Sequence, residues 1–499
     1  MDVPPLHGSP ETLGQALAAA AEQYGDREAY VDGAERIGFA RWIGRARALA
    51  SVLTARGVRP GDVVALMLPS GIDYAVCYAA AAWIGAVTTG LNTRLGPREV
   101  TAILDRAAPA LVIRDGAAGL PEVTAWPVLD RAEVPRETAE DGPAPAAVRA
   151  EDPAVIVWTS GTTGLPKGAW FDHHNLAAAA RTAGVMSAPD DRKLVSTPFP
   201  HAGYMGKLWD QLAWGTTFVV SPVPWSAPEM ARVLREERIT VAGGVPTQWA
   251  KLLTEPSMVG QGLPHVRVGI AATAPAAPEL VRRTAELLGV PLVVRYAMTE
   301  SPSICGTEPD DPPDVQATTV GRPQDGMAIR LVDDAGAEVA PGEVGRICVR
   351  GPVVMRGYWR DPELTASVLG ADGWLRSGDL GRIGADGNLT LVGRVGDMYI
   401  RGGYNVYPLE VENVLAEHPQ IAKVAVLGRP APVIGEIGVA VVVPADPADP
   451  PTRDALRAWV SDRLADYKAP DELVLVDELP LTAMLKVDRL ALSEALFTG

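Results

Sequence analysis

The sequence is poor in cysteine, in lysine and in long runs of strongly apolar residues. Only three cysteines occur among the 499 residues, at Cys77, Cys305 and Cys348, and no two of them form a C-x-x-C pair. This scarcity disfavours a disulfide framework and a cysteine-rich zinc site, and it fits a reducing cytoplasm. Residues 1–15 lack the basic and apolar regions of a signal peptide, so the sequence predicts a cytoplasmic location.

The best candidate for a membrane span is the segment 74–91, which has 18 residues without a charge. It is rich in Ala, Gly and Thr, and its length is marginal for crossing a bilayer. We therefore expect a buried, alanine-rich core helix in this segment and no membrane span.

Positive charge is also scarce, since the chain has 45 basic and 61 acidic residues and a net charge of −16. Non-specific nucleic-acid binding and binding to anionic membranes both need a basic surface, so neither is expected, although local basic pockets for phosphates remain open. Hydrophobic residues make up 47% and charged residues 21%, as in soluble globular proteins, which argues against a disordered or fibrous chain.

Strand and helix patterns alternate in the first third of the chain and again over 154–300, which predicts α/β layers. From about 320 the pattern becomes short strands with turns such as Asp386-Gly387, a hairpin signal. The last hundred residues read as a separate α+β unit, in which Thr452 is expected to cap a helix. That helix carries an apolar stripe expected to be core, at Leu456, Trp459, Val460, Leu464 and Tyr467. We expect a large N-terminal domain of α/β subdomains plus a β-rich subdomain (1–393), a hinge (394–397) and a small mobile α+β domain (398–499).

The most informative segment is 155–168, VIVWTSGTTGLPKG, in which an apolar strand runs into glycines and hydroxyl side chains. Glycines let the backbone approach a ligand closely and present N–H groups, and a lysine adds a point charge. This pattern predicts a polyphosphate site made by Thr159, Ser160, Gly161, Thr162, Thr163, Gly164 and Lys167. It is not a Walker A loop, because two residues separate the glycines and Gly168 follows Lys167, and no G-x-S-x-G elbow surrounds Ser160.

This loop matches the signature of the adenylate-forming superfamily, which contains acyl-CoA synthetases, luciferases and adenylation domains. Further segments resemble motifs of that family in the same order along the chain. They are YAMTE at 296–300 (with Ala297 in the usual Gly place), SGD at 377–379, GRVGD at 393–397, GGYNVYP at 402–408 and PLTAMLKVDR at 480–489. The resemblance covers essentially the whole chain.

The resemblance implies a role for each matching position. The loop 159–167 would hold the β- and γ-phosphates of ATP, Tyr296 would stack on adenine, and Thr299 would contact the α-phosphate. Glu300 would help to bind Mg²⁺, a cation that prefers oxygen ligands. The ribose hydroxyls would bind Asp379 and Arg394, and Ala272 and Thr273 would lie beside the nucleotide and acyl sites. The small domain would pivot at Asp397 and present either Lys486 or the segment Gly402, Gly403 and Tyr404.

The rarity of lysine bears on two of these positions. The chain has only seven lysines against 38 arginines, yet Lys167 and Lys486 stand at motif positions. This retention suggests that a compact point charge is needed there. The resemblance implies that Lys486 bridges the substrate carboxylate and ATP. Leu485 departs from the family, where a Gly usually precedes this lysine.

The residues of the acyl site are inferred from their positions relative to the family motifs. His201 lies in PFPHAGYMGKLW, where the family often places a residue lining the acyl and thiol channel. Further candidate wall residues are Tyr204, Trp209, Val245 and Met298. With Ala272 and Thr273 they are apolar or neutral, which favours an acid with a hydrophobic tail or ring (fatty, alicyclic or aryl) over an amino acid or a diacid.

The resemblance implies an ATP-dependent carboxylic acid–CoA ligase that uses ATP, Mg²⁺ and coenzyme A and forms an acyl-AMP. One alternative keeps this chemistry but loads the acyl group onto a carrier protein. A second is a weakly active nucleotide- or acyl-binding homologue, motivated by Leu485, and a third is an oxygenase of the luciferase type. The sequence leaves open which acid is used and whether the chain is a monomer or a homodimer.

Overall fold

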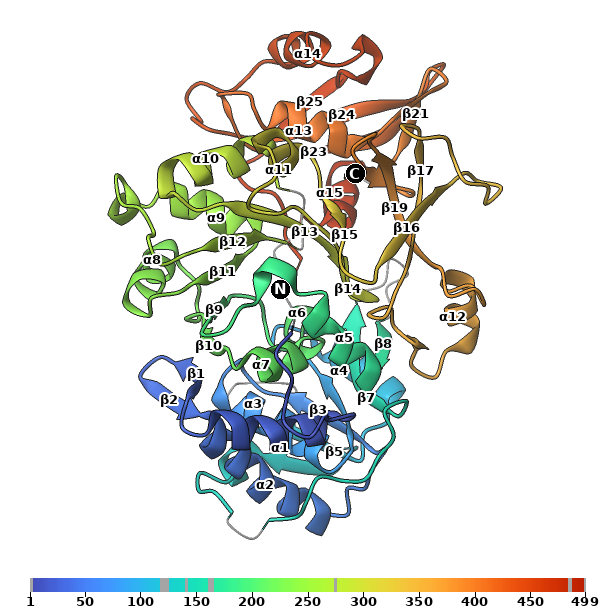
Figure 1. Cartoon of the computed structure of the whole chain (residues 1–499). Coiled ribbons are helices and arrows are strands. Elements are labelled where there is room, and N and C mark those ends of the chain that lie inside the picture. The colour runs from blue at the N-terminus through green and yellow to red at the C-terminus, as the bar shows by residue number, and fades with distance from the viewer. Residues whose placement is uncertain are drawn as a thin grey trace.

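The computed structural model describes residues 3–116, 125–139, 142–159, 166–272, 276–482 and 487–497. It consists of a large N-terminal domain and a smaller C-terminal domain, which Figure 1 shows at the bottom and at the top of the view. The mixed α/β architecture expected from the sequence is confirmed. The helices of the large domain are α1 (Leu13–Tyr24), α2 (Phe39–Ala55), α3 (Ile72–Trp83), α4 (Pro97–Ala107), α5 (His173–Arg181), α6 (Ala202–Met205), α7 (Leu208–Trp214), α8 (Ala227–Glu236), α9 (Pro246–Leu253), α10 (Pro278–Leu288), α11 (Pro313–Thr318) and α12 (Pro362–Val368).

The first sheet carries the glycine-rich loop. It is parallel from β7 to β6, and β8 and β18 extend it in antiparallel fashion. Its strands, in spatial order, are β18 (Gly357–Tyr358), β8 (Lys167–Asp172), β7 (Pro153–Thr159), β4 (Val87–Gly90), β3 (Val63–Met67), β5 (Leu111–Arg114) and β6 (Val128–Asp130). The alanine-rich helix α3 packs against α1 and α2, and all of its residues are buried. The expected core helix is therefore confirmed.

The second sheet supplies the other half of the site. Its central strands are parallel, so that the loops after them leave at one edge of the sheet. Its strands, in spatial order, are β15 (Arg322–Pro323), β14 (Ser301–Gly306), β13 (Leu292–Met298), β12 (Val268–Ala271), β11 (Val241–Gly244), β9 (Arg192–Val195), β10 (Thr217–Val220), β1 (Glu28–Asp32) and β2 (Glu35–Gly38). The two sheets and the helices between them share one hydrophobic core.

A third, antiparallel sheet forms the predicted β-rich part. Its strands are β16 (Ala328–Val332), β17 (Val344–Arg350), β19 (Leu375–Ile383) and β20 (Leu389–Arg394). The predicted hairpin at Asp386-Gly387 joins β19 to β20, and Gly387 has a φ of +80°, which a glycine adopts without strain. The register of this hairpin pairs Asp379 with Arg394, so two candidate site residues lie on adjacent strands.

The small domain has its own sheet and its own cores. Its strands are β22 (Tyr404–Val406), β21 (Tyr399–Arg401), β24 (Gly435–Pro444), β23 (Ile421–Ala431) and β25 (Glu472–Leu475), with helices α13 (Pro408–Leu415), α14 (Arg453–Ser461) and α15 (Arg489–Phe497). Alternate residues of β23 enter two hydrophobic clusters, Val426 in one and Leu427 in the other, because successive side chains point to opposite faces. Neither cluster contains a described residue before Tyr399.

One prediction for the small domain is only partly right. Leu456 and Val460 of the expected apolar stripe are buried, and Thr452 caps α14 as the sequence suggests. Trp459, however, is only partly buried, because its ring faces the large domain and stacks under the Arg463 guanidinium, 3.5 Å from the ring centroid.

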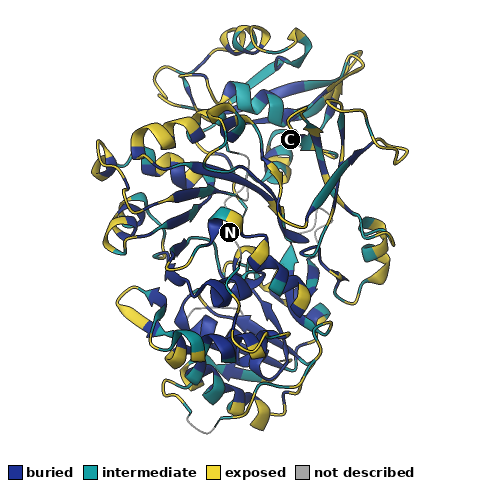
Figure 2. Cartoon of the chain, in the orientation of Figure 1, coloured by how far each residue is buried: buried dark blue, intermediate teal, exposed yellow. Residues whose placement is uncertain are grey.

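Buried residues fill the strands and the helices between the sheets, as Figure 2 shows. All three cysteines lie in these buried regions as free thiols, and burial raises the pKa of each. Within the described residues, none of the helices has both the length and the apolar character that a membrane-crossing helix needs.

Candidate active site

The glycine-rich loop begins and ends at neighbouring positions of the first sheet. Thr159, the last residue of β7, pairs with Lys167, the first residue of β8. The Lys167 ammonium lies 5.9 Å from the ring centroid of Tyr358 on β18. The predicted site residues Ser160, Gly161, Thr162, Thr163 and Gly164 lie outside the described residues. The structure therefore fixes both ends of the loop.

Glu300, just after β13, is linked through Tyr358 to the described end of this loop at Lys167. Its carboxylate oxygen Oε1 accepts a 2.7 Å hydrogen bond from the Tyr358 hydroxyl, and the residue is only 8% exposed. Burial raises the pKa of Tyr358, so this phenol remains protonated and donates. The second oxygen, Oε2, accepts no hydrogen bond from the residues that the structure describes. A nearly buried carboxylate with a free oxygen is suited to a hard divalent cation, which takes one or two carboxylates beside phosphate oxygens.

A second acidic centre, at Asp379 of β19, is bound by Tyr296, which lies on β13 four residues before Glu300. The Tyr296 hydroxyl donates a 2.6 Å hydrogen bond to Oδ2 of Asp379, and Arg394 Nε donates a 3.1 Å bond to Oδ1. The backbone N–H of Asp379 donates to the Ser377 hydroxyl, which fixes the start of this turn. Desolvation and the Asp379 carboxylate together raise the pKa of Tyr296. Three residues that the sequence assigned to nucleotide binding are thus joined in one hydrogen-bonded cluster.

The segment after β9 forms the helical side of the site. His201 caps α6, and its Nδ1 accepts a 3.1 Å hydrogen bond from the Gly203 N–H. Because Nδ1 accepts, the proton of the neutral ring resides on Nε2. This capping bond fixes the ring orientation of His201 at the start of the helix.

The proposed wall residues separate into two groups. Val245 and Ala272 follow the adjacent parallel strands β11 and β12, and Met298 ends the next strand, β13, so these residues lie at one edge of the sheet. Tyr204 and Trp209 instead lie in the core, 1% and 6% exposed, and Tyr204 stacks on Phe199. Thr273 lies outside the described residues.

The hinge and the small-domain motifs lie above the large domain. Asp397 forms an ion pair with Arg489, the first residue of α15, at 3.5 Å between Oδ2 and Nε. Gly402 and Gly403 form the tip of the β21–β22 hairpin with φ angles of +57° and +86°. The exposed ring of Tyr404 stacks on Tyr467, with 4.5 Å between the ring centroids. Lys486 and Leu485 lie outside the described residues.

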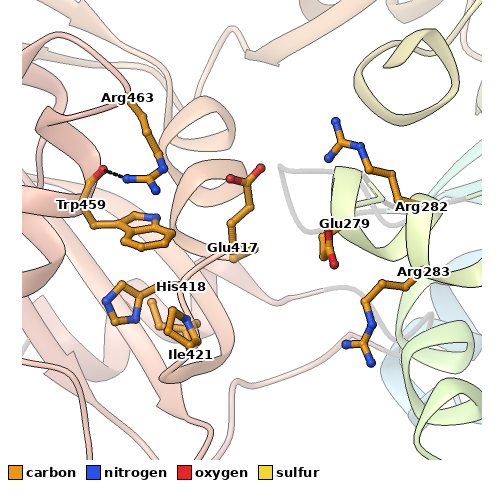
Figure 3. Close-up of a pocket in the computed structure, with 10 residues that line it drawn as sticks. Glu279, Arg282, Arg283, Glu417, His418, Ile421, Trp459 and Arg463 are labelled. Atoms are coloured by element: carbon orange, nitrogen blue, oxygen red, sulfur yellow. Dashed lines mark hydrogen bonds between the residues drawn. The ribbon is translucent and has the colours of Figure 1, made fainter. Parts of the chain in front are cut away.

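A cleft of about 480 Å³ separates α10 of the large domain from the small domain. Figure 3 shows Arg282 and Arg283 of α10 on one side of this cleft, and Trp459 and Arg463 of the small domain on the other. Because its two sides belong to different domains, the cleft changes shape if the domains move relative to each other. Of the residues assigned to the site from the sequence, none that the structure describes lines this cleft.

Two residues of the site were missed in the sequence. Tyr358 holds Glu300, but 58 residues separate the two and no local pattern links them. Lys207 lies in the PFPHAGYMGKLW segment, but the candidate wall residues named from the sequence are all apolar or neutral and do not include it. Its positive charge was the signal available in the sequence.

Comparison with known proteins gives the family context of this arrangement. The model of the AMP-binding enzyme matches residues 17–359, and that of the AMP-binding enzyme C-terminal domain matches residues 410–486. The 3-[(3aS,4S,7aS)-7a-methyl-1,5-dioxo-octahydro-1H-inden-4-yl]propanoyl:CoA ligase of Rhodococcus jostii is 34% identical over 97% of this chain and 99% of its own. The feruloyl-CoA synthase of Amycolatopsis sp. is 36% identical over 91% of this chain and 93% of its own.

Among solved structures, the fold is similar to that of MatB from Rhodopseudomonas palustris. The ATP-bound form of that protein has a TM-score of 0.87 at 29% identity, covering 97% of this chain and 98% of that chain. Its apo form, with the same coverage, has a TM-score of 0.78. The chain as a whole is therefore more similar to the ATP-bound form than to the apo form.

Proposed function

The chain belongs to the AMP-binding enzyme family, and on that premise we propose which of its residues carry out the two half-reactions of a carboxylic acid–CoA ligase. The enzyme is an AMP-forming acid–CoA ligase that uses ATP, Mg²⁺ and coenzyme A. In the first half-reaction a carboxylate oxygen attacks the α-phosphorus of ATP, and the bond to the β-phosphate breaks to release pyrophosphate. In the second, the CoA sulfur attacks the acyl carbon of the acyl-AMP, and AMP leaves.

The phosphates of ATP bind the loop 159–167 in this proposal, with Lys167 as its positive charge. The described end of the loop supports this, because Lys167 lies beside the ring of Tyr358, whose hydroxyl binds Glu300. Glu300 would hold Mg²⁺ with the carboxylate oxygen that Tyr358 leaves free, and Thr299 would contact the α-phosphate. When bound, Mg²⁺ would neutralise the negative charge of the phosphates.

The nucleoside binds at the cluster of Tyr296, Asp379 and Arg394. Both Asp379 oxygens are held in the structure, and each oxygen retains a second lone pair that can accept from a ribose hydroxyl. Arg394 is the more exposed partner, with 61% of its side chain accessible against 12% for Asp379, so it is free to turn toward a ligand. The Tyr296 ring, tied through its hydroxyl, then offers a fixed face to adenine.

The acid lies between the helical segment at His201 and the strand ends at Val245, Ala272 and Met298. We propose an apolar ring system as its body, since these wall residues carry no charge. The two relatives support a cyclic acid: one is named for a feruloyl group, and the other for a propanoyl chain on a bicyclic skeleton with two ketones. His201, with its ring fixed by Gly203, lines the passage toward the thiol.

The small domain presents different residues to the two half-reactions. We propose that Lys486 stabilises the charge that develops during acyl-AMP formation, and that the domain then pivots at 394–397 to bring Gly402, Gly403 and Tyr404 to the CoA passage. The similarity to the ATP-bound form supports the first of these orientations for the present structure. The domain limits 1–393 and 398–499 follow from this pivot, and the separate hydrophobic clusters of the small domain support them.

Two further proposals concern the setting of the enzyme. A cytoplasmic location is supported by its three free, buried thiols. A homodimer is compatible with the chain, and the mass of the enzyme in solution, measured by light scattering, decides between a monomer and this dimer.

The observation that carries the function is the convergence of the loop ends, Glu300 and the Tyr296–Asp379–Arg394 cluster at one edge of the large domain. The test is a panel of carboxylic acids incubated with ATP, Mg²⁺ and CoA while AMP release is followed. We expect acid-dependent exchange of labelled pyrophosphate into ATP, and thioester formation when CoA is added. Exchange without transfer to CoA would instead favour an acyl carrier protein as acceptor, and absence of exchange with every acid would refute the proposal.

A further inference from the structure

Lys207 is a cation in the helical side of the site without a partner among the described residues. It lies between α6 and α7, six residues after His201, and its backbone N–H donates to the Tyr204 carbonyl. Its ammonium forms no hydrogen bond or ion pair within the part of the chain that the structure describes. In a chain with only seven lysines against 38 arginines, this position keeps a compact charge.

The charged groups around Lys207 are Asp210, Lys193 and Arg295. The carboxylate among them is already engaged, since Asp210 Oδ2 lies 2.7 Å from Lys193 Nζ and both its oxygens accept from the Ser187 hydroxyl. Arg295 is paired with Glu308 at 3.4 Å. Two cations therefore have partners, and the charge of Lys207 is in excess.

The charged neighbours of Lys207 come from the helical segment and from the second sheet. Asp210, three residues later and on the same helical face, reaches Lys193 on β9, and Arg295 lies on β13 directly before Tyr296. Gly206, the preceding residue, lies against β14, where an added Cβ would come within 3.2 Å of Pro302 Cγ. Lys207 thus lies between α6–α7 and the strands that carry the proposed nucleotide and acyl residues.

Burial governs the chemistry of this ammonium. Desolvation lowers the pKa of Lys207 to about 8, and the nearby Asp210 opposes this shift. The group is therefore mainly protonated at neutral pH. The side chain nevertheless keeps some accessible surface. A desolvated ammonium without a partner is costly unless an acceptor reaches it, and the surface that Lys207 keeps accessible is where an acceptor can do so.

We propose that Lys207 binds an oxygen acceptor, a ketone or a carboxylate, at the end of the substrate acid distant from its reacting carboxyl group. This inference rests on the proposed function, because it assigns one end of the same acyl site. The acid then has an apolar cyclic body between the neutral walls and one polar oxygen at its far end. An acid that ends in a plain hydrocarbon leaves the ammonium unpaired and is disfavoured.

The test compares three acids that share one skeleton. They are cyclohexanepropanoate, its ring ketone and its ring carboxylate, with each substituent opposite the propanoate chain. The readout is kcat and KM for the acid in pyrophosphate exchange, together with KM for ATP. The wild-type enzyme should prefer the ketone or the carboxylate by about 10- to 100-fold in kcat/KM, the range of one hydrogen bond to a charged group. A preference for the ketone identifies a neutral acceptor, and a preference for the carboxylate identifies a diacid.

Lys207→Met keeps the length of the side chain and removes its charge. This variant should lose the preference through KM for the acid, with KM for ATP unchanged, and should use the plain acid at least as well as the wild type. Lys251→Met, at an exposed lysine of α9, is the matched control and should keep the wild-type preference. Thermal unfolding of both variants shows that they fold.

Failure of this inference is distinguishable from failure of the function. If the acids support exchange but the wild type shows no preference, or Lys207→Met keeps the preference, Lys207 does not bind the distal oxygen. If no acid supports exchange with any of the proteins, the proposed function fails, and the inference fails with it.

Discussion

Arg489, the first residue of α15, lies with its Nε atom 3.5 Å from Oδ2 of Asp397, the residue proposed as the pivot of the small domain. The same guanidinium also binds Glu412 on α13 and the carbonyl of Val426 on β23. Arg489 comes three residues after Lys486 in the sequence. One side chain therefore joins the pivot to the body of the small domain and to the segment that carries the proposed catalytic lysine.

The pivot can be tested with Asp397→Pro. Proline fixes φ near −65° and removes the N–H that donates to the Arg394 carbonyl at 3.2 Å. We expect one domain orientation to be trapped, so that one half-reaction slows at least about tenfold more than the other, a barrier difference of about 1.4 kcal/mol. Pyrophosphate exchange and thioester formation are assayed separately. Asp397→Asn is the control, because it weakens the ion pair to Arg489 without fixing the backbone. A parallel loss in both half-reactions, or no loss, would contradict the rotation.

The metal role of Glu300 predicts a specific change in Glu300→Gln. Glutamine can still accept the hydrogen bond from Tyr358, but it lacks the negative charge that attracts Mg²⁺. The Mg²⁺ concentration for half-maximal turnover should rise by about tenfold or more, without loss of folding. Tyr358→Phe leaves the carboxylate in place and should change this concentration less. An unchanged Mg²⁺ dependence in Glu300→Gln would remove the metal role.

The electrostatic role of Lys486 is tested with Lys486→Ala. Acyl-AMP formation should fall by about 10²–10³-fold, the scale for the loss of one electrostatic contact in a transition state. Thioester formation from supplied acyl-AMP should be largely spared, because that half-reaction uses the other domain orientation. Lys423→Ala, at an exposed lysine of β23, should leave both steps unchanged. Equal losses in both half-reactions would refute the assignment.

A buried histidine predicts how stability depends on pH. His173 is 2% exposed, its Nδ1 accepts from the Leu13 N–H, and burial lowers its pKa from 6.5 to about 4. Below pH 6.5 the unfolded chain binds a proton at this residue that the folded chain does not. The free energy of unfolding should therefore fall, by up to about 3 kcal/mol from this residue, as pH decreases from 6.5 to 4.

This contribution is measured by chemical denaturation across that pH range. His173→Gln should show a shallower dependence than the wild type. His174→Gln is the matched control, because the neighbouring ring is 54% exposed. Identical slopes for the wild type and His173→Gln would show that His173 does not contribute.

The local features of the fold were predictable from the sequence, and the contacts between distant segments were not. The hairpin at Asp386-Gly387 and the cap at Thr452 depend on a few adjacent residues, and the structure confirms both. The Asp379–Arg394 pair follows from the same hairpin. The Glu300–Tyr358 hydrogen bond instead depends on the pairing of β18 with the first sheet. The residues near Glu300 in the sequence do not indicate that pairing.

Lys207 shows the same limit for charge. In sequence, a lysine three residues before Asp210 suggests a simple ion pair within the helix. In the structure Asp210 instead forms an ion pair with Lys193 on β9. Whether a charge is compensated is decided by tertiary contacts, so periodicity and composition could not reveal that Lys207 lacks a partner.

The burial of Cys77, Cys305 and Cys348 has a practical consequence for watching the domains move. Burial raises the pKa of these thiols, so they carry little thiolate and react slowly with maleimide dyes. Cysteines introduced at Arg283 and Glu417, on opposite sides of the interdomain cleft, would then be labelled selectively in an otherwise unaltered chain. Energy transfer between two such dyes would follow each orientation during turnover, in single molecules and without removal of any native side chain from the core.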